Sequence, residues 1–254
     1  MRGKRTASRR AIYATLLGVV ALGYGAPAFA GPADRLRDSL FKNRPGEITG
    51  PPIACYVSED GRVFTLDRTH PAPLLKFEDN PEVFALAPNP APRGDVIYKN
   101  DLGEPMLRAT RLGGFTLFTD KRPSGEAVSL ARGCAPLRLV ILSPQALGER
   151  LLQASVRSGR AARRSVLFEA EATPNSAALI ADAAMVVTLA YMRIAAKDGG
   201  RATLSRVGKV EFAEGRKPSV GFSGGTLRIV VTPAQGLAGR PSSERVVKAL
   251  RSGR

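Results

Sequence analysis

One stretch of the chain, residues 176–197, is apolar at nearly every position. Its polar members are Ser176, Asp182, Thr188, Arg193 and Lys197. A helix that is apolar almost all round must be buried, so the rest of the chain has to fold around it. A membrane-spanning helix is disfavoured, because Asp182 and Arg193 would lie within the span and much of the run is alanine. We therefore expect a central core helix over residues 176–197.

Different patterns precede and follow this helix. Residues 53–140 alternate short apolar segments with turn residues, which is typical of an antiparallel meander of six to eight strands. Within it, the segment PNPAPRGD at 88–95 is expected to be a rigid loop, because proline fixes the backbone. After the helix come three short strand patterns and a closing helix that opens at Pro241 with a serine cap. The predicted class is α+β: an antiparallel, β-rich N-terminal half, then a buried long helix packed on a small, mostly antiparallel sheet.

The expected organisation has five parts. They are a cleaved leader at 1–30, a short helix and linker at 31–52, the β meander at 53–140, a helix and basic loop at 141–164, and the α+β half at 165–254. In the second part, Leu36, Leu40 and Phe41 share one face of the expected helix.

The leader has the composition of an export signal. Residues 1–10 carry five cations and no acid, and residues 11–25 form an apolar run. Ala28-Phe29-Ala30 is the small-x-small pattern of a cleavage site, so we expect the cut before Gly31. The run is shorter than the ~20 residues of a membrane-spanning helix, so no transmembrane segment is expected after cleavage. The mature protein is thus expected in the periplasm or secreted, and Arg9-Arg10 leaves both the general and the twin-arginine route open.

The only two cysteines, Cys55 and Cys134, both follow the leader. In an oxidising compartment an isolated pair predicts a disulfide, which here would close a loop of about 80 residues. Two buried free thiols are the alternative. A redox pair is disfavoured because the close C-x-x-C spacing is missing.

The net charge suggests which class of partner the protein binds. Beyond residue 30 the chain has 33 of its 38 cations and all 22 acids, for a net charge of +11. That charge favours an anionic envelope component as partner. Nucleic acid is not expected, because the few aromatic residues are not interleaved with the cations. Residues 157–164, RSGRAARR, hold the one cluster of arginines (Arg157, Arg160, Arg163 and Arg164), which we interpret as a solvated loop rather than a dedicated binding patch.

Catalytic motifs are weak. Gly221-x-Ser223-x-Gly225 matches a nucleophile elbow, but a strand pattern follows it and the only histidine, His70, lies upstream. Ser39-x-x-Lys42 lacks the partner motifs of a serine–lysine site. No cofactor, metal or catalytic residue is predicted from the motifs. The remaining candidates are acids in two loops, namely Glu78, Asp79, Glu82, Asp95, Asp101 and Glu104.

Several irregular segments give the chain a family resemblance. They are YVSEDGRVFTLDR at 56–68, the long segment from PLLKFEDNPEVF to GGFTLFT at 73–119, AALIADAAMVVTLAYMRIA at 177–195, and GLAGRPSSERV at 236–246. Through them the chain resembles an uncharacterised family of exported bacterial proteins, domain-of-unknown-function family 4908. The resemblance spans most of the chain beyond the leader and implies no activity.

The expected function is that of a non-enzymatic envelope protein, which binds or scaffolds a partner. Loops stiffened by proline and glycine can present polar groups to a partner. The candidate partner-binding residues are Arg93, Asp95, Asn100, Asp101 and Arg240.

Two alternatives stay open. The first is an envelope hydrolase that uses carboxylates from the loops at 78–104, since glycoside hydrolysis needs two acids facing one cleft. The second is a peripheral binder of anionic lipid or glycan that uses the arginines at 157–164.

Overall fold

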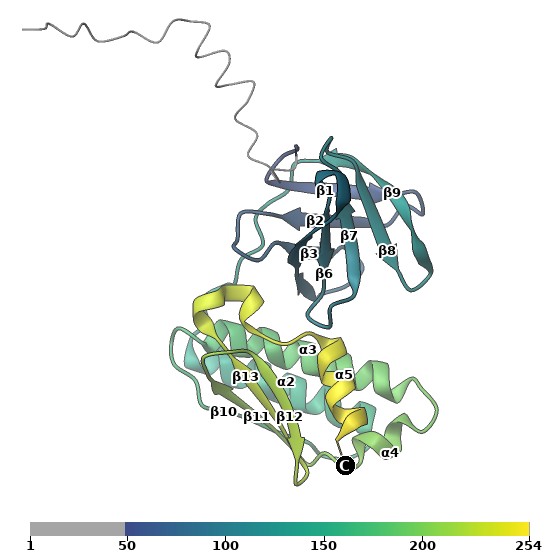
Figure 1. The fold of residues 1–254 in the computed structure, drawn as a ribbon. Helices are drawn as coiled ribbons and strands as arrows, with labels where there is room; N and C mark the ends of the chain where they lie inside the picture. The colour runs from purple at the N-terminus through teal and green to yellow at the C-terminus, as the bar shows by residue number, and fades with distance from the viewer. Residues whose placement is uncertain (1–48, 254) are drawn as a thin grey trace, which may run out of the picture. The chain divides into compact units, whose positions relative to one another are not determined.

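The computed structural model describes residues 49–253. A β half is followed by an α+β half that contains all of the described α-helices (Figure 1). The predicted cleavage residues Ala28, Ala30 and Gly31, and the helix predicted before residue 44, lie outside the described residues.

The β half is built on one antiparallel sheet. Its strands within the described residues are β1 (Ile53–Ser58), β2 (Val63–Asp67), β3 (Leu74–Phe77), β4 (Val83–Ala85), β5 (Ala87–Pro90), β6 (Val96–Lys99), β7 (Pro105–Ala109), β8 (Phe115–Thr119) and β9 (Arg122–Arg132). The strand order is β4-β3-β2-β1-β9-β8-β7-β6-β5. The predicted antiparallel, β-rich half is confirmed, although β9, its longest strand, was not among the predicted elements.

The two edges of this sheet are joined by a single residue. Strands β4 and β5 are at opposite ends of the pairing order, yet β4 ends at Ala85 and β5 begins at Ala87. Leu86 alone can connect them only if the sheet curls until its edges are adjacent. Alternate side chains then point into one shared core. That core consists of Ala54, Tyr56, Phe64, Leu66, Leu75, Phe77, Phe84, Leu86, Tyr98, Leu107, Ala109, Phe115 and Leu117.

The rigid loop predicted at 88–95 is partly wrong. Pro88 and Pro90 belong to β5, an edge strand paired only with β6. Proline is tolerated there because its missing N–H can face away from the ladder. The segment then turns through a short 3-10 helix, η1 (Pro92–Gly94), in which Arg93 has a left-handed φ of 65°.

The α+β half surrounds the predicted core helix. Its elements are α2 (Pro144–Ala162), β10 (Leu167–Ala170), α3 (Ala177–Ala195), α4 (Gly200–Leu204), β11 (Lys209–Glu214), β12 (Ser219–Ser223), β13 (Thr226–Val231), the 3-10 helix η2 (Pro233–Gly239) and α5 (Ser243–Ser252). The α+β class is therefore confirmed.

The small sheet is not mostly antiparallel as predicted. Its order is β10-β11-β13-β12, and of its three pairings β10 with β11 and β11 with β13 are parallel. Helices α3 and α4 carry the chain back between β10 and β11, which permits the parallel pairing. Only β12 and β13 form a hairpin, and its return strand β13 inserts beside β11. The sequence predicted a mostly antiparallel sheet because these three short strands follow one another with only short turns between them.

Helix α3 is the core helix. Among residues 49–253 it is the one helix long and apolar enough to cross a membrane, but most of it is buried inside the protein. It packs with α2, α5 and one face of the small sheet. Tyr191 of α3 is fully buried, and its hydroxyl has no hydrogen-bond partner within the described part of the chain.

The basic loop predicted at 157–164 is largely helical. Ser143 caps α2 by accepting a hydrogen bond from the N–H of Ala146 at 3.2 Å, and the helix ends before Arg163, whose φ is 57°. Arg157 and Arg160 therefore lie on the helix. Arginine and alanine are good helix formers, so propensity agrees with this result where the charge cluster suggested a loop.

The disulfide is confirmed. Cys55 of β1 is bonded to Cys134, with 5.5 Å between the Cα atoms, a separation usual for such bonds. Because β1 pairs with β9, the bond lies where the first and last strands of the sheet meet.

Candidate functional site

The segment Arg240–Arg245, which we call the junction segment, holds the two halves together. It leads from η2 into the first turn of α5 (Figure 1). Ser242 caps α5, and its Oγ accepts a hydrogen bond from the N–H of Arg245 at 3.1 Å, so the predicted serine cap is confirmed. Both halves belong to one compact unit that spans residues 44–254.

Arg240 is buried at the centre of this junction. Its guanidinium pairs with Asp182 of α3, lies 3.9 Å from the carboxylate of Glu82, and donates to the carbonyl of Val83 at 3.0 Å. Glu82 also accepts from the N–H and the hydroxyl of Ser243, at 2.8 and 2.5 Å. Burial raises the pKa of Glu82, although Arg240 and Ser243 oppose that shift. A buried cation matched in this way fixes the halves in register.

Asp101, in the turn after β6, binds the same segment from another side. Its carboxylate accepts from the N–H and the hydroxyl of Ser242, at 3.0 and 2.6 Å, and from Arg245 at 2.9 Å. The start of α5 thus donates hydrogen bonds to carboxylates of the β half, which satisfy N–H groups that have no partner within a helix.

Asn100, beside Asp101, joins two carboxylates. Its side-chain amide donates to Glu104 at 2.8 Å and to Glu244 of α5 at 2.9 Å. Glu244 also pairs with Arg193 of α3 at 3.3 Å. Burial raises the pKa of Glu244 despite the nearby arginine, and Glu104 and Asp120 raise it further.

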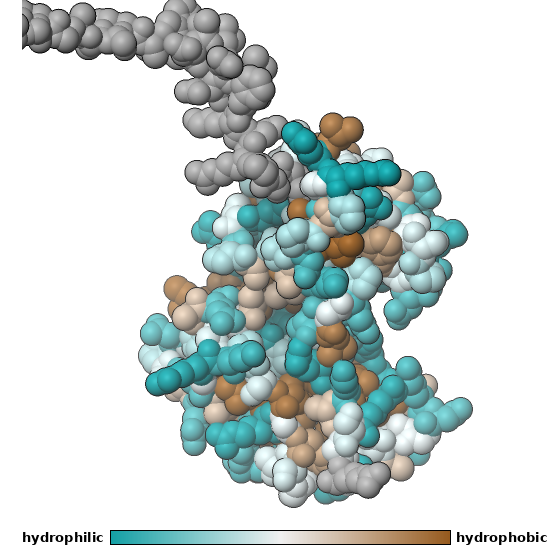
Figure 2. Space-filling view, in the orientation of Figure 1, coloured by the Kyte–Doolittle hydropathy of each residue, from teal (hydrophilic) through white to brown (hydrophobic). Residues whose placement is uncertain are grey.

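A cavity of about 360 Å³ opens beside these groups, and we call it the junction cavity. In Figure 2 the surface is hollowed between the two halves. Its apolar wall includes Phe77, Phe84, Met106 and Phe118, and the Arg62 guanidinium lies 4.2 Å from the centre of the Phe77 ring. Its polar lining is Arg62, Asn80, Asn100, Glu104, Thr119, Asp120, Arg193 and Glu244.

The predicted binding residues fall into two groups. Asn100, Asp101 and Arg240 come together in the junction. Arg93 and Asp95 do not, because Asp95 accepts hydrogen bonds from Arg108 at 2.9 Å and from the N–H of Arg111 at 3.4 Å. The hydrogen bond from Arg108 lowers the pKa of Asp95. This pair connects the end of the η1 turn to β7.

Most acids that a hydrolase could use are held by arginine. The pairs are Glu78 with Arg132 at 2.7 Å, Asp79 with Arg62 at 3.2 Å, Glu82 with Arg240, Asp95 with Arg108, and Asp101 with Arg245. Only Glu104 of the six lines the junction cavity. In residues 49–253 no group of three or more His, Cys, Asp or Glu side chains is placed to hold a metal ion.

The Gly221-x-Ser223-x-Gly225 motif is a hairpin turn. Ser223 ends β12 opposite Thr226 of β13, and Gly224 and Gly225 both have positive φ. A nucleophile elbow needs a helix after the serine, so this motif has the geometry of a turn alone.

Sequence reasoning missed Arg193 and Glu244 as lining residues. Arg193 was noted only as a polar member of the core-helix pattern, and Glu244 was not singled out. The run Ser-Ser-Glu-Arg at a helix start was the available signal, since its polar side chains exceed what one cap needs.

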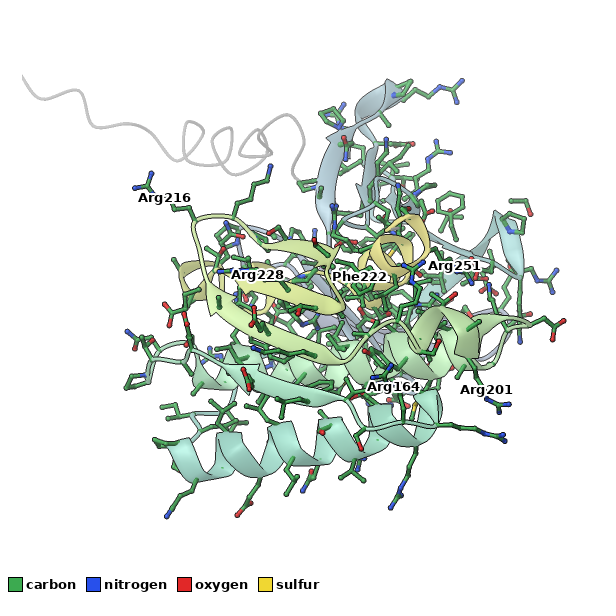
Figure 3. The ribbon with its side chains drawn as sticks, turned by 90° about the horizontal axis from the view of Figure 1, so that it is seen from below. Arg164, Arg201, Arg216, Phe222, Arg228 and Arg251 are labelled. Carbon is green, nitrogen blue, oxygen red and sulfur yellow. A yellow bond between two sulfur atoms is a disulfide. The ribbon has the colours of Figure 1, made fainter. Side chains whose placement is uncertain are left out.

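The two halves also differ in charge. Residues 49–142 contain eleven cations and eleven acids, whereas residues 143–253 contain seventeen cations and eight acids. The excess of +9 in the described chain therefore belongs entirely to the α+β half. Figure 3 shows five of its arginines at separate places on that half: Arg164, Arg201, Arg216, Arg228 and Arg251.

Comparison with known proteins identifies a family that the chain matches. A family model described as Domain of unknown function (DUF4908) matches residues 35–250, a range that contains the junction segment and the whole lining of the junction cavity. No curated protein and no solved structure gives a significant match.

Proposed function

The chain belongs to the DUF4908 family of domains of unknown function, so we propose a function from its own residues. It is an exported protein of the cell envelope, located in the periplasm or secreted, and it binds a ligand in the junction cavity without transforming it. The observation that carries the binding proposal is the composition of that cavity.

The junction cavity combines an apolar wall with an excess of carboxylates. Arg62 is matched by Asp79 and Arg193 by Glu244, whereas Glu104 and Asp120 have no ion-pair partner among residues 49–253. Binding sites for small molecules typically combine apolar walls with a few placed polar groups. The cavity therefore suits a ligand that has an apolar face beside hydrogen-bond donors or a positive charge, such as an amine or an amino sugar.

Binding is favoured over hydrolysis by the state of the acids. A glycosidase pair needs one carboxyl group free to give a proton and a second free to attack or activate water. Glu104 and Glu244 share the Asn100 amide, and Glu244 is also held by Arg193. Both acids are thus engaged as hydrogen-bond acceptors, and Asp120 is the one lining carboxylate without a partner among residues 49–253, whereas a glycosidase needs two free acids.

Two features support export. The leader has a basic start, an apolar run and a small-x-small end. The Cys55–Cys134 disulfide is of the kind that persists in oxidising compartments. Mass spectrometry of the protein from its native host should find an amino terminus at Gly31 and no alkylatable thiol. An intact Met1 with two free thiols would refute export.

The binding proposal is tested by ligand-induced thermal stabilisation. We expect glucosamine oligomers or aryl amines to raise the unfolding temperature, and the effect to fall in Phe118→Ala and Glu104→Gln. Glu59→Gln, an exposed acid outside the cavity, is the matched control. Equal stabilisation of all variants, or conversion of the sugar to products, would contradict the proposal.

A further inference from the structure

The exposed side of α2 combines aliphatic and basic residues. Of the large hydrophobic side chains that are exposed in the described chain, Leu152 (65% exposed) and Val156 (44%) lie on this helix. Val140 (76%) and Ile141 (93%) lie just before it. We call α2's exposed side, together with Val140 and Ile141, the α2 surface.

The helix packs on the core with another face. Its buried residues are Leu147, Ala154, Ser158 and Ala162, which face α3 and the core. Leu152 and Val156 are four positions apart, so they lie on one face, one turn from each other. In Figure 3, α2 is the teal helix along the lower side of the view, and its side chains project away from the rest of the protein. Core packing therefore does not explain these two aliphatic residues.

Cations surround the aliphatic residues. Arg150, Arg157 and Arg160 are exposed on α2, and Arg163 is exposed at its end. None of the four forms an ion pair with any residue between 49 and 253. Glu149 is the only acid from residue 138 to residue 166, a stretch with six arginines. Val140 and Arg150 line the same groove, so the segment before α2 adjoins the N-terminal part of the helix.

We propose that the α2 surface docks on an anionic lipid bilayer. Helices that lie on membranes place aliphatic side chains at the head-group boundary and surround them with arginine or lysine. Each such cation near an anionic surface strengthens association about fivefold. Charge complementarity therefore selects an anionic surface, and the aliphatic residues select lipid over an acidic polysaccharide.

A second copy of the chain fits this surface poorly. Pairing two α2 surfaces would bring their unmatched arginines together, and like charges at close range repel. Membrane docking goes beyond the proposed ligand binding, since none of these residues lines the junction cavity. Either proposal can therefore fail without the other.

A fluorescent reporter tests insertion directly. The chain has no tryptophan, so Ile141→Trp introduces a single one on the α2 surface. Leu112→Trp is the matched control, because Leu112 is equally exposed (92%) but lies on the neutral β half. With vesicles of phosphatidylcholine and phosphatidylglycerol, we expect a blue shift of emission for Ile141→Trp and none for Leu112→Trp. No shift for Ile141→Trp, or equal shifts for both, overturns the proposal.

A charge-matched pair of variants tests the arginines. Arg157→Gln with Arg160→Gln should lower binding to these vesicles at least about tenfold at low salt. Arg216→Gln with Arg228→Gln removes the same charge elsewhere on this half and should lower it less than about threefold. All four sites are exposed or partly exposed, and thermal melts verify folding. Equal losses in both variants, equal binding to pure phosphatidylcholine, or binding to an acidic polysaccharide without a tryptophan shift would each refute lipid docking.

Discussion

The two halves close their cores in different ways. The rolled sheet of the β half encloses an aromatic core, in which neighbouring rings such as Tyr56 and Phe115 have centroids 4.9 Å apart. The α+β half instead wraps α3 in helices and a small sheet, and its core is mainly aliphatic. The first half carries the disulfide and no net charge, whereas the second has no cysteine and carries the whole excess of +9.

The two halves also use arginine differently for structure. In the β half, four arginines form ion pairs with acids, as Arg108 does with Asp95. In the α+β half, two arginines instead bind carbonyls near helix ends: Arg164 donates to Ser205 and Arg206 to Leu250 and Gly253. Cations at helix C-termini are stabilising without any acid. The second half can therefore accumulate positive charge without losing its fold.

The most destabilising substitution is expected at the junction segment, where the two halves meet. Arg240→Ala leaves the buried Glu82 and the partly exposed Asp182 without their cation, so we expect a loss of about 3–5 kcal/mol in the free energy of unfolding. Urea unfolding followed by circular dichroism measures it. Arg245→Ala is the control, because its half-exposed ion pair should contribute roughly 1 kcal/mol or less. Similar losses in the two variants would contradict the central place of Arg240.

The second prediction concerns the disulfide, which lies in the β half. Replacing Cys55 and Cys134 by serine should cost about 4 kcal/mol, because the unfolded chain regains the freedom of a long loop. Hydrogen exchange should quicken first in β1 and β9 and least in α3. Uniform acceleration in both halves would show that they unfold as one unit.

The third prediction concerns pH. Burial raises the pKa of Glu82 in the folded state above its ordinary value of 4.5, so the folded protein binds a proton more tightly than the unfolded chain. The stability of the wild type relative to Glu82→Gln should therefore fall as pH rises from 4 through the raised pKa. Melts of both proteins between pH 4 and 8 measure this difference. A constant difference across that range would show that Arg240 and Ser243 cancel the cost of burial.

The smallest predicted effect lies inside the α+β core. The buried hydroxyl of Tyr191 lacks a partner within residues 49–253, and burial raises its pKa. Tyr191→Phe removes this polar atom and should stabilise the protein by about 1 kcal/mol. Tyr56→Phe in the β-half core is the comparison variant. A destabilised Tyr191→Phe would mean that the hydroxyl has a partner in solution.

Features with a strong local pattern were predictable from the sequence. The core helix was expected at 176–197 and runs from Ala177 to Ala195, and the serine cap of α5 and the disulfide are also confirmed. Strand β9 was not predicted because most of its side chains are exposed, so its sequence lacks the alternation of apolar and polar residues that marks a strand. The parallel pairing in the small sheet was not predicted because strand order depends on contacts between distant residues, which no local sequence pattern encodes.

The candidate site was predicted only in part. Asn100, Asp101 and Arg240 were singled out, but their meeting depends on contacts across 141 to 161 residues, such as Glu82 with Ser243. Sequence spacing gives no measure of such distances. Arg93 and Asp95 shared the same signal, a polar turn beside proline, and lie elsewhere. Turn chemistry thus identified polar loops without showing which of them converge.

The pairing of β1 with β9 determines when the disulfide can form during export and folding. A chain threaded across a membrane from its amino terminus would deliver Cys55 long before Cys134, so sulfur oxidation would report the moment at which the sheet is complete. A chain carried across already folded would instead bring the two thiols in together, preassembled and still reduced. The cytosolic precursor would be reduced on either route, so its protease resistance, measured while it is trapped before translocation, would discriminate the two proposed export routes.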